Sequence, residues 1–74
     1  MPKLYSSKEI LFVMNLLGFS FVSQKGSHGK FKNSEGKIAI LPMEKKEIPE
    51  GTFHAILKQI EISKKEFVEL LSKG

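Results

Sequence analysis

The chain has 74 residues, which gives room for one domain (residues 1–74), because a chain this short buries only about 60% of its unfolded surface. The absence of cysteine excludes disulfides and thiolate metal sites, and no apolar run approaches the roughly 20 residues that a membrane-spanning helix needs. All 12 basic residues are lysines and all 8 acidic residues are glutamates, which excludes arginine contacts to bases and the aspartate clusters typical of two-metal nucleases.

The positive charge is concentrated in the middle of the chain. Residues 25–46 hold six lysines against two glutamates, whereas the segments on either side are close to neutral. We therefore expect residues 25–46 to face an anionic partner.

Apolar residues make up 41% of the chain, as in folded domains, and residues 1–5 lack the apolar core of a signal peptide. The expected location is the reducing cytoplasm.

The first predicted element is a helix over residues 7–17. A capping box precedes it, and four apolar residues recur at helical spacing: Ile10, Val13, Met14 and Leu17. Phe12 and Leu16 fall on the opposite side of this helix, one turn apart. We expect these two residues to be exposed and to form a partner interface. The alternative is that a later helix covers them.

Three strands follow, because the apolar period changes to two. They cover residues 19–24, 28–33 and 37–41. In the first strand Phe19 and Phe21 share a face, and in the second Phe31 is expected to point toward the helices. In the third strand Ile38 and Ile40 share a face. Since one face of each strand is apolar, we expect helices to cover that face of the sheet.

Two helices complete the predicted fold. The first covers residues 49–60, with Pro49 in the first turn, where its missing amide costs nothing. The second covers residues 64–71 and follows another capping box. The order α-β-β-β-α-α predicts an α+β fold, with a three-stranded antiparallel sheet and helices on one face.

The second strand carries the clearest chemical signal. If Phe31 faces the helices, the period of two places His28, Lys30 and Lys32 on the other face. An imidazole can exchange a proton near neutral pH, and ammonium groups bind phosphate, so this set suits a phosphodiester of RNA. The alternative is a solvated polar strand whose lysines prevent edge pairing.

Further residues could bind RNA beside this strand. Gly26 and Ser27 could bring backbone amides to a phosphate, although a tight hairpin explains the same two residues equally well. Lys25, at the start of the same turn, completes this group. Lys45 and Lys46 precede a helix whose free amides favour anions, so they would bind a second phosphate. The alternative is a solubilising pair beside two glutamates.

No metal ion or other cofactor is expected. The second histidine, His54, lies off the apolar stripe of its helix, where we expect a partly exposed side chain without a catalytic role. Two histidines without cysteine or aspartate make a poor ligand set for zinc.

Three segments resemble the HicA (YcfA-like) toxin family: residues 24–31 (QKGSHGKF), residues 41–42 (LP) and residues 48–59 (IPEGTFHAILKQ). The resemblance extends over residues 7–68. It implies a fold like that of a double-stranded RNA-binding domain, mRNA interferase activity, and a HicB-type antitoxin as partner. It also implies that His28, in the family's Gly-Ser-His motif, is the catalytic histidine. The chain departs from the family pattern at Gly29 and at Met43–Glu44, where many members have further histidines.

We therefore expect a metal-independent endoribonuclease toxin, in which His28 is the general base and Lys30 with Lys32 stabilises the phosphoryl oxygens. The proton for the leaving 5′-oxygen could come from water, Lys30 or His28 itself. The alternatives are a non-catalytic RNA-binding module, which grips phosphate with the same face, and a protein-interaction domain centred on Phe12 and Leu16. The partner at Phe12 and Leu16 would be the antitoxin or a weakly bound second copy of the toxin.

Overall fold

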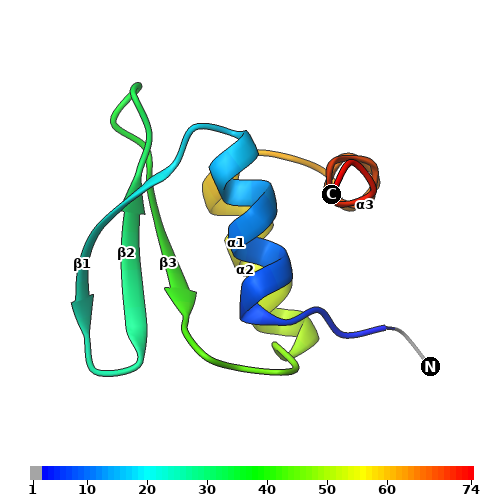
Figure 1. The fold of residues 1–74 in the computed structure, drawn as a ribbon, viewed down its shortest axis with the longest axis horizontal. Coiled ribbons are helices and arrows are strands. Elements are labelled where there is room, and N and C mark those ends of the chain that lie inside the picture. Colours follow the sequence, from blue (N-terminus) through cyan, green and yellow to red (C-terminus); the bar gives the residue numbers. More distant parts are fainter. Residues whose placement is uncertain (1–2) are drawn as a thin grey trace.

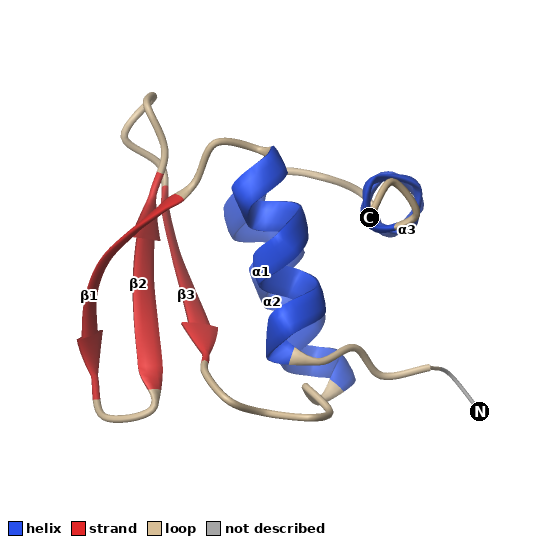
Figure 2. Cartoon of the chain, in the orientation of Figure 1, coloured by secondary structure: helices blue, strands red, loops and turns tan. Residues whose placement is uncertain are grey.

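The computed structural model describes residues 3–74 (Figure 1). The elements are α1 (Ser7–Leu16), β1 (Ser20–Lys25), β2 (His28–Lys32), β3 (Ile38–Pro42), α2 (Glu50–Ile60) and α3 (Lys64–Leu71). The strands form an antiparallel sheet in the order β1-β2-β3. Helices α1 and α2 lie beside β3, and α3 lies beyond them (Figure 2). The predicted α+β fold is confirmed.

Local side-chain caps set the starts of two helices. At α1, the amide nitrogen of Glu9 donates a hydrogen bond to Ser6 Oγ at 3.1 Å. The amide nitrogen of Ser6 donates in return to Glu9 Oε1 at 2.9 Å. Ser63 and Glu66 form the same reciprocal pair at α3. Both predicted capping boxes are therefore present. Among residues 3–74, none of the helices combines the length and apolar character that a membrane crossing requires.

One cluster of buried side chains lies between the sheet and the helices. Its members include Ile10, Val13, Met14, Phe19, Phe31, Ala39, Leu41, Ile48, Ile56, Leu57 and Ile60. On the far side of α1 and α2, the rings of Tyr5, Phe53 and Phe67 pack against one another, with centroids 4.8–5.2 Å apart. These aromatic contacts join α2, α3 and the segment before α1.

The expected orientation of β3 is wrong. Ile38 and Ile40 do share a face, but it is the open face of the sheet, where they are 38% and 37% exposed. Ala39 is fully buried instead. The reason is the register, because Ala39 pairs with Phe31, and directly opposed residues of antiparallel strands point to the same side.

β1 also differs from the expectation. Phe19 is buried, but it precedes the strand, and all six residues of β1 are exposed. Phe21 is 56% exposed, although its ring meets that of Phe31 edge-on at a centroid distance of 5.7 Å. A register shift between Phe21 and Ser23 bends the strand. The helices pack against β3, which is the opposite edge strand of the sheet. β1 therefore projects beyond the helices.

A two-residue turn brings His28 opposite Lys25. The turn consists of Gly26 and Ser27, and Lys25 pairs with His28 across it. Gly26 has φ 60° and Ser27 has a negative φ, which is the pattern of a type II′ hairpin turn with glycine first. The amide of Met43 donates to the carbonyl of Ser27 at 2.7 Å, which ties the turn to the end of β3.

Ser7 fastens the loop after β3 to the start of α1. This residue is only 4% exposed, and its Oγ donates to the carbonyl of Pro42 at 2.5 Å and accepts the amide of Lys45 at 2.9 Å. The amide of Ser7 also donates to the carbonyl of Lys45 at 2.9 Å. The loop therefore lies against the first turn of α1.

α2 is joined to the outer edge of β3. The amide of Ile40 donates to Gln59 Oε1 at 2.8 Å, and Lys37 Nζ lies 2.8 Å from Glu61 Oε1. The hydrogen bond to Glu61 raises the pKa of the Lys37 ammonium above its usual value. The outward-facing amide of Ile40 thus has a partner on α2, which limits pairing of this edge with another chain.

We predict that Ser7→Ala lowers the free energy of unfolding by about 1–3 kcal/mol, because it leaves the partly buried carbonyl of Pro42 and the amide of Lys45 without their side-chain partner. The control is Ser34→Ala, at an exposed turn residue, which should change that free energy by less than about 0.5 kcal/mol. Urea denaturation of both variants measures the difference. Equal stability of the two variants would show that other contacts hold the loop.

Candidate functional site

The open face of the sheet carries the residues singled out in β2. His28, Lys30 and Lys32 are exposed, whereas Gly29 and Phe31, which alternate with them, are buried toward the helices. The predicted alternation of β2 is therefore confirmed. The imidazole and the lysine ammonium groups share one solvent-facing surface.

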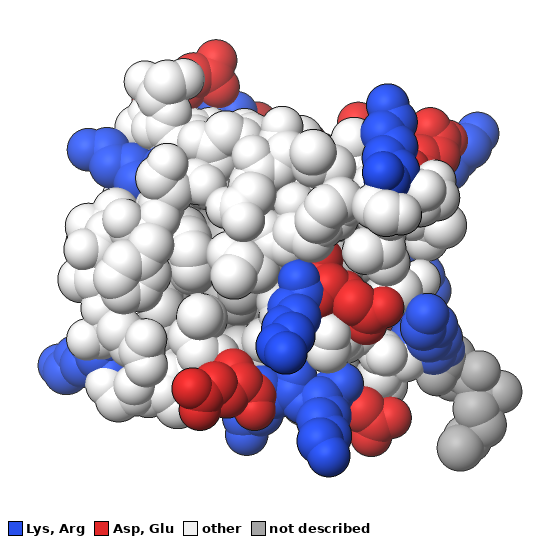
Figure 3. Space-filling model, in the orientation of Figure 1, with Lys and Arg blue, Asp and Glu red and all other residues white. Residues whose placement is uncertain are grey.

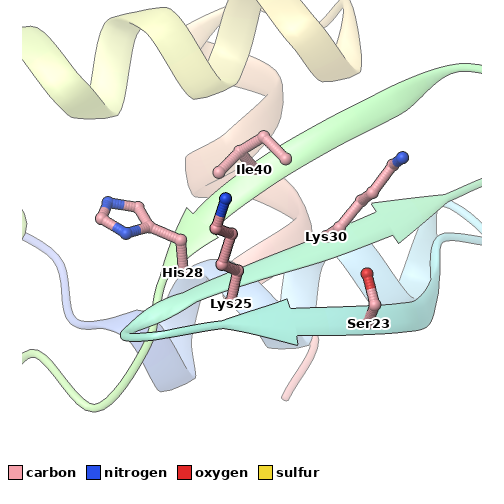
Figure 4. A pocket seen from close by; sticks show the side chains of 5 residues that line it. All are labelled: Ser23, Lys25, His28, Lys30 and Ile40. Carbon is pink, nitrogen blue, oxygen red and sulfur yellow. The ribbon is translucent and has the colours of Figure 1, made fainter.

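An open hollow of about 560 Å³ lies on this face, which we call the sheet hollow. Residues from all three strands line it: Ser23, Lys25, His28, Lys30 and Ile40 (Figure 4). Cross-strand pairing explains this set, because Lys25 is paired with His28, and Lys30 is paired with both Ser23 and Ile40. Figure 4 shows these side chains rising from the same side of the sheet.

The sheet hollow has the chemistry of an anion site. Two ammonium groups, one imidazole and one hydroxyl line it, and none of its lining residues is acidic. Within residues 3–74 the His28 ring makes no hydrogen bond to another side chain or to the backbone, so both ring nitrogens are available to a ligand. A phosphate in the hollow would meet positive charge from two strands and a group that can accept or donate a proton.

Lys32 lies on the same face but outside the sheet hollow. It pairs with Ser20 and Ile38, four residues along β2 from His28 and hence about 13 Å away along the strand. The structure therefore groups Lys25 and Lys30 with His28, whereas the expected pair was Lys30 and Lys32.

Lys45 and Lys46, in the loop after β3, lie beside the start of α1. They line a second hollow together with Ser6, Ser7, Lys8 and Glu44. Figure 3 shows lysine side chains with acidic neighbours in the lower part of the molecule, where α1 begins and the loop after β3 passes. Lys8 was not expected beside this pair, because its place next to the loop depends on the hydrogen bonds that Ser7 makes, and no local spacing signals them.

The surface expected on α1 is exposed at one of its two residues. Leu16 is 49% exposed, at the end of α1 whose surroundings are largely uncharged in Figure 3. Phe12 is partly buried and packs against the core, and a β-carbon at Gly74 would come within 2.8 Å of its Cζ. α3 and the residues after it therefore cover Phe12, which corrects the expectation for that residue.

His54 lies on the exposed side of α2. Its Nε2 is 3.5 Å from Oε1 of Glu50, one helical turn away. It lies on another element from His28 and does not line the sheet hollow. Among residues 3–74, no three His, Cys, Asp or Glu side chains come close enough to share a metal ion.

The described site falls within a segment that matches a known family. The family described as "HicA toxin of bacterial toxin-antitoxin" matches residues 7–62, which run from the start of α1 to just beyond α2 and include the whole sheet hollow. The comparison with curated proteins gives no match. The match covers more than half of the chain, and it confirms the resemblance found in the Gly-Ser-His segment and its neighbours. The chain therefore belongs to the HicA toxin family of bacterial toxin–antitoxin systems.

Proposed function

We propose that this toxin is a metal-independent endoribonuclease that cleaves mRNA in the sheet hollow, with His28 as general base. The observation that carries the proposal is the grouping of His28 with Lys25 and Lys30 in one open hollow without an acidic lining residue. Membership of a toxin family whose members usually cleave mRNA supports RNA as the substrate.

The reaction begins at a ribose whose 2′-hydroxyl lies against the imidazole. His28 takes the proton of this hydroxyl, and the 2′-oxygen forms a bond to the adjacent phosphorus. The bond between phosphorus and the 5′-oxygen of the next nucleotide breaks, which leaves a 2′,3′-cyclic phosphate and a 5′-hydroxyl. Lys25 and Lys30 stabilise the charge that builds on the phosphoryl oxygens. The leaving oxygen takes a proton from water, from Lys30 or from the protonated His28.

Other exposed groups hold the RNA on either side of the reacting phosphate. Lys32 binds a neighbouring phosphate from its place farther along β2. Gly26 and Ser27 are exposed at the turn before His28, where their backbone can approach a phosphate closely. Lys45 and Lys46 bind a phosphate more distant along the strand, with Lys8 beside them.

The antitoxin partner is of HicB type and covers the exposed end of α1 around Leu16. Half of this side chain's surface is open to solvent. A partner that covers this side chain removes its apolar surface from water, which favours binding. A second copy of the toxin is the weaker candidate for the same surface.

We predict that His28→Ala lowers the rate of RNA cleavage by about 10²–10⁴-fold and abolishes growth arrest on expression, because it removes the proton transfer. The matched control is His54→Ala, which removes the other exposed histidine and should keep the parent's activity. Cleavage of a defined mRNA, assayed in EDTA, measures both variants. Unchanged cleavage by His28→Ala would remove His28 from the mechanism, and RNA that the parent retains but never cuts would favour the non-catalytic binding module.

Replacement of both Lys45 and Lys46 by alanine should flatten the salt dependence of RNA binding. Each lost phosphate contact lowers the slope of log K against log salt by about 0.7 for a single strand. The control replaces Lys64 and Lys65, an adjacent exposed pair at the start of α3, and should leave the slope unchanged. Fluorescence titrations at several salt concentrations give the slopes. The same slope in both double variants would show that Lys45 and Lys46 do not bind RNA.

Leu16→Gln should keep the parent's melting temperature but weaken binding of the antitoxin, because the side chain is half exposed and contributes little to the core. Phe12→Ala should lower the melting temperature by several degrees, since its ring packs against the core and Gly74. Thermal melts and co-purification with the antitoxin distinguish the two effects. Normal antitoxin binding by Leu16→Gln would place the interface elsewhere.

A further inference from the structure

Ile40 is an apolar residue in a hollow that is otherwise polar. The other lining side chains are those of serine, lysine and histidine. Ile40 is 37% exposed, and the core does not use it, because Ala39 and Leu41 supply the buried side chains of β3. The hollow thus combines an aliphatic surface with two ammonium groups.

The position of Ile40 is fixed by strand pairing on one side of β3 and by a hydrogen bond to α2 on the other. Ile40 stands directly opposite Lys30, and its amide points away from β2 to Gln59 of α2. The pair of Ile40 and Lys30 is therefore of the kind without mutual backbone bonds, in which the Cα atoms are only about 4.5 Å apart. An aliphatic surface and an ammonium group lie side by side, held by the sheet and by Gln59.

We propose that one unpaired nucleobase packs against Ile40 while Lys25 and Lys30 hold the phosphates beside it, so that the toxin acts on single-stranded RNA. The proposal rests on RNA cleavage at His28. The flat face of a base that has left its stack is largely apolar, and its contact with Ile40 removes apolar surface of both from water. The volume of the hollow lies within the roughly 300–1,000 Å³ of sites for small ligands, so a nucleotide fits its scale.

A duplex fits the same hollow poorly. Its bases are stacked inside the helix, and it presents mainly phosphates and 2′-hydroxyls, which would contact the lysines and leave Ile40 unused. The proposed reaction also needs the attacking and leaving oxygens in line with phosphorus, a geometry that the backbone of a regular RNA duplex does not adopt. A single strand can offer phosphates to the lysines of the hollow and an unstacked base to Ile40 at the same time.

The chain supplies a matched control for Ile40. Ile38 lies on the same strand and the same face and is 38% exposed, but it pairs with Lys32 and does not line the hollow. Ile40→Thr and Ile38→Thr remove the same apolar group and keep a β-branched side chain, which strands favour. Any difference in RNA binding between the two variants therefore measures what the apolar side chain inside the hollow contributes.

The experiment uses a fluorescent single-stranded oligonucleotide with 2′-fluoro riboses, which the toxin cannot cut through a 2′-hydroxyl. Ile40→Thr should weaken binding by about fivefold, the low end of the range for a base stacked on an aromatic side chain, and Ile38→Thr should leave it unchanged. Neither variant should change the affinity for the same oligonucleotide annealed to its complement.

A second probe compares two strands on the parent toxin, and this comparison does not depend on how well Ile40→Thr folds. The same strand with abasic sites should bind the parent toxin more weakly than the intact strand, and Ile40→Thr should bind both strands equally. Equal binding of intact and abasic strands by the parent, equal losses in the two isoleucine variants, or a preference for the duplex would each overturn the proposal. A parent toxin that binds the strand through Ile40 but leaves the ribose version uncut would instead contradict the proposed cleavage.

Discussion

The burial of Phe31 fixes which side of β2 faces solvent, and the site depends on that choice. Phe31 is 2% exposed and stands opposite Phe21 and Ala39 in the two neighbouring strands. Because side chains alternate along a strand, a shift by one residue would expose Phe31 and turn His28 and Lys30 toward the core. Burial of an unpaired ammonium group is costly, so the shifted register is strongly disfavoured. The contact that completes the core also presents the imidazole and the lysines to solvent.

Local signals were enough to predict the elements, because capping boxes and apolar periods act within a few residues. The order of helices and strands and the alternation along β2 could be read in this way. The open-face position of Ile38 and Ile40 could not, since it depends on which residues of β2 they oppose. The position of Lys8 beside Lys45 could not be predicted either. It depends on the hydrogen bond between Ser7 and Lys45, which are 38 residues apart in the sequence.

Two departures from the family pattern lie next to each other in the structure. A β-carbon at Gly29 would come within 3.0 Å of Met43 Sδ and of a ring carbon of Phe31, both on the helix-facing side of the sheet. A side chain at Gly29 thus requires Met43 to move, so the glycine and the methionine fit together as a pair. The side of Gly29 that would carry a side chain also points away from the sheet hollow. His28 is therefore the one histidine among the residues that line the sheet hollow, with Lys25 and Lys30 as its neighbours.

The chemistry of the cut ends tests whether His28 activates a ribose 2′-hydroxyl of the RNA itself. RNA cleaved by the purified toxin can be analysed by mass spectrometry of the fragments. Attack by the 2′-oxygen predicts a 2′,3′-cyclic phosphate on the upstream fragment and a 5′-hydroxyl on the downstream fragment. Fragments with a 3′-hydroxyl and a 5′-phosphate would show that water attacks the phosphorus directly, and they would contradict the proposed role of His28.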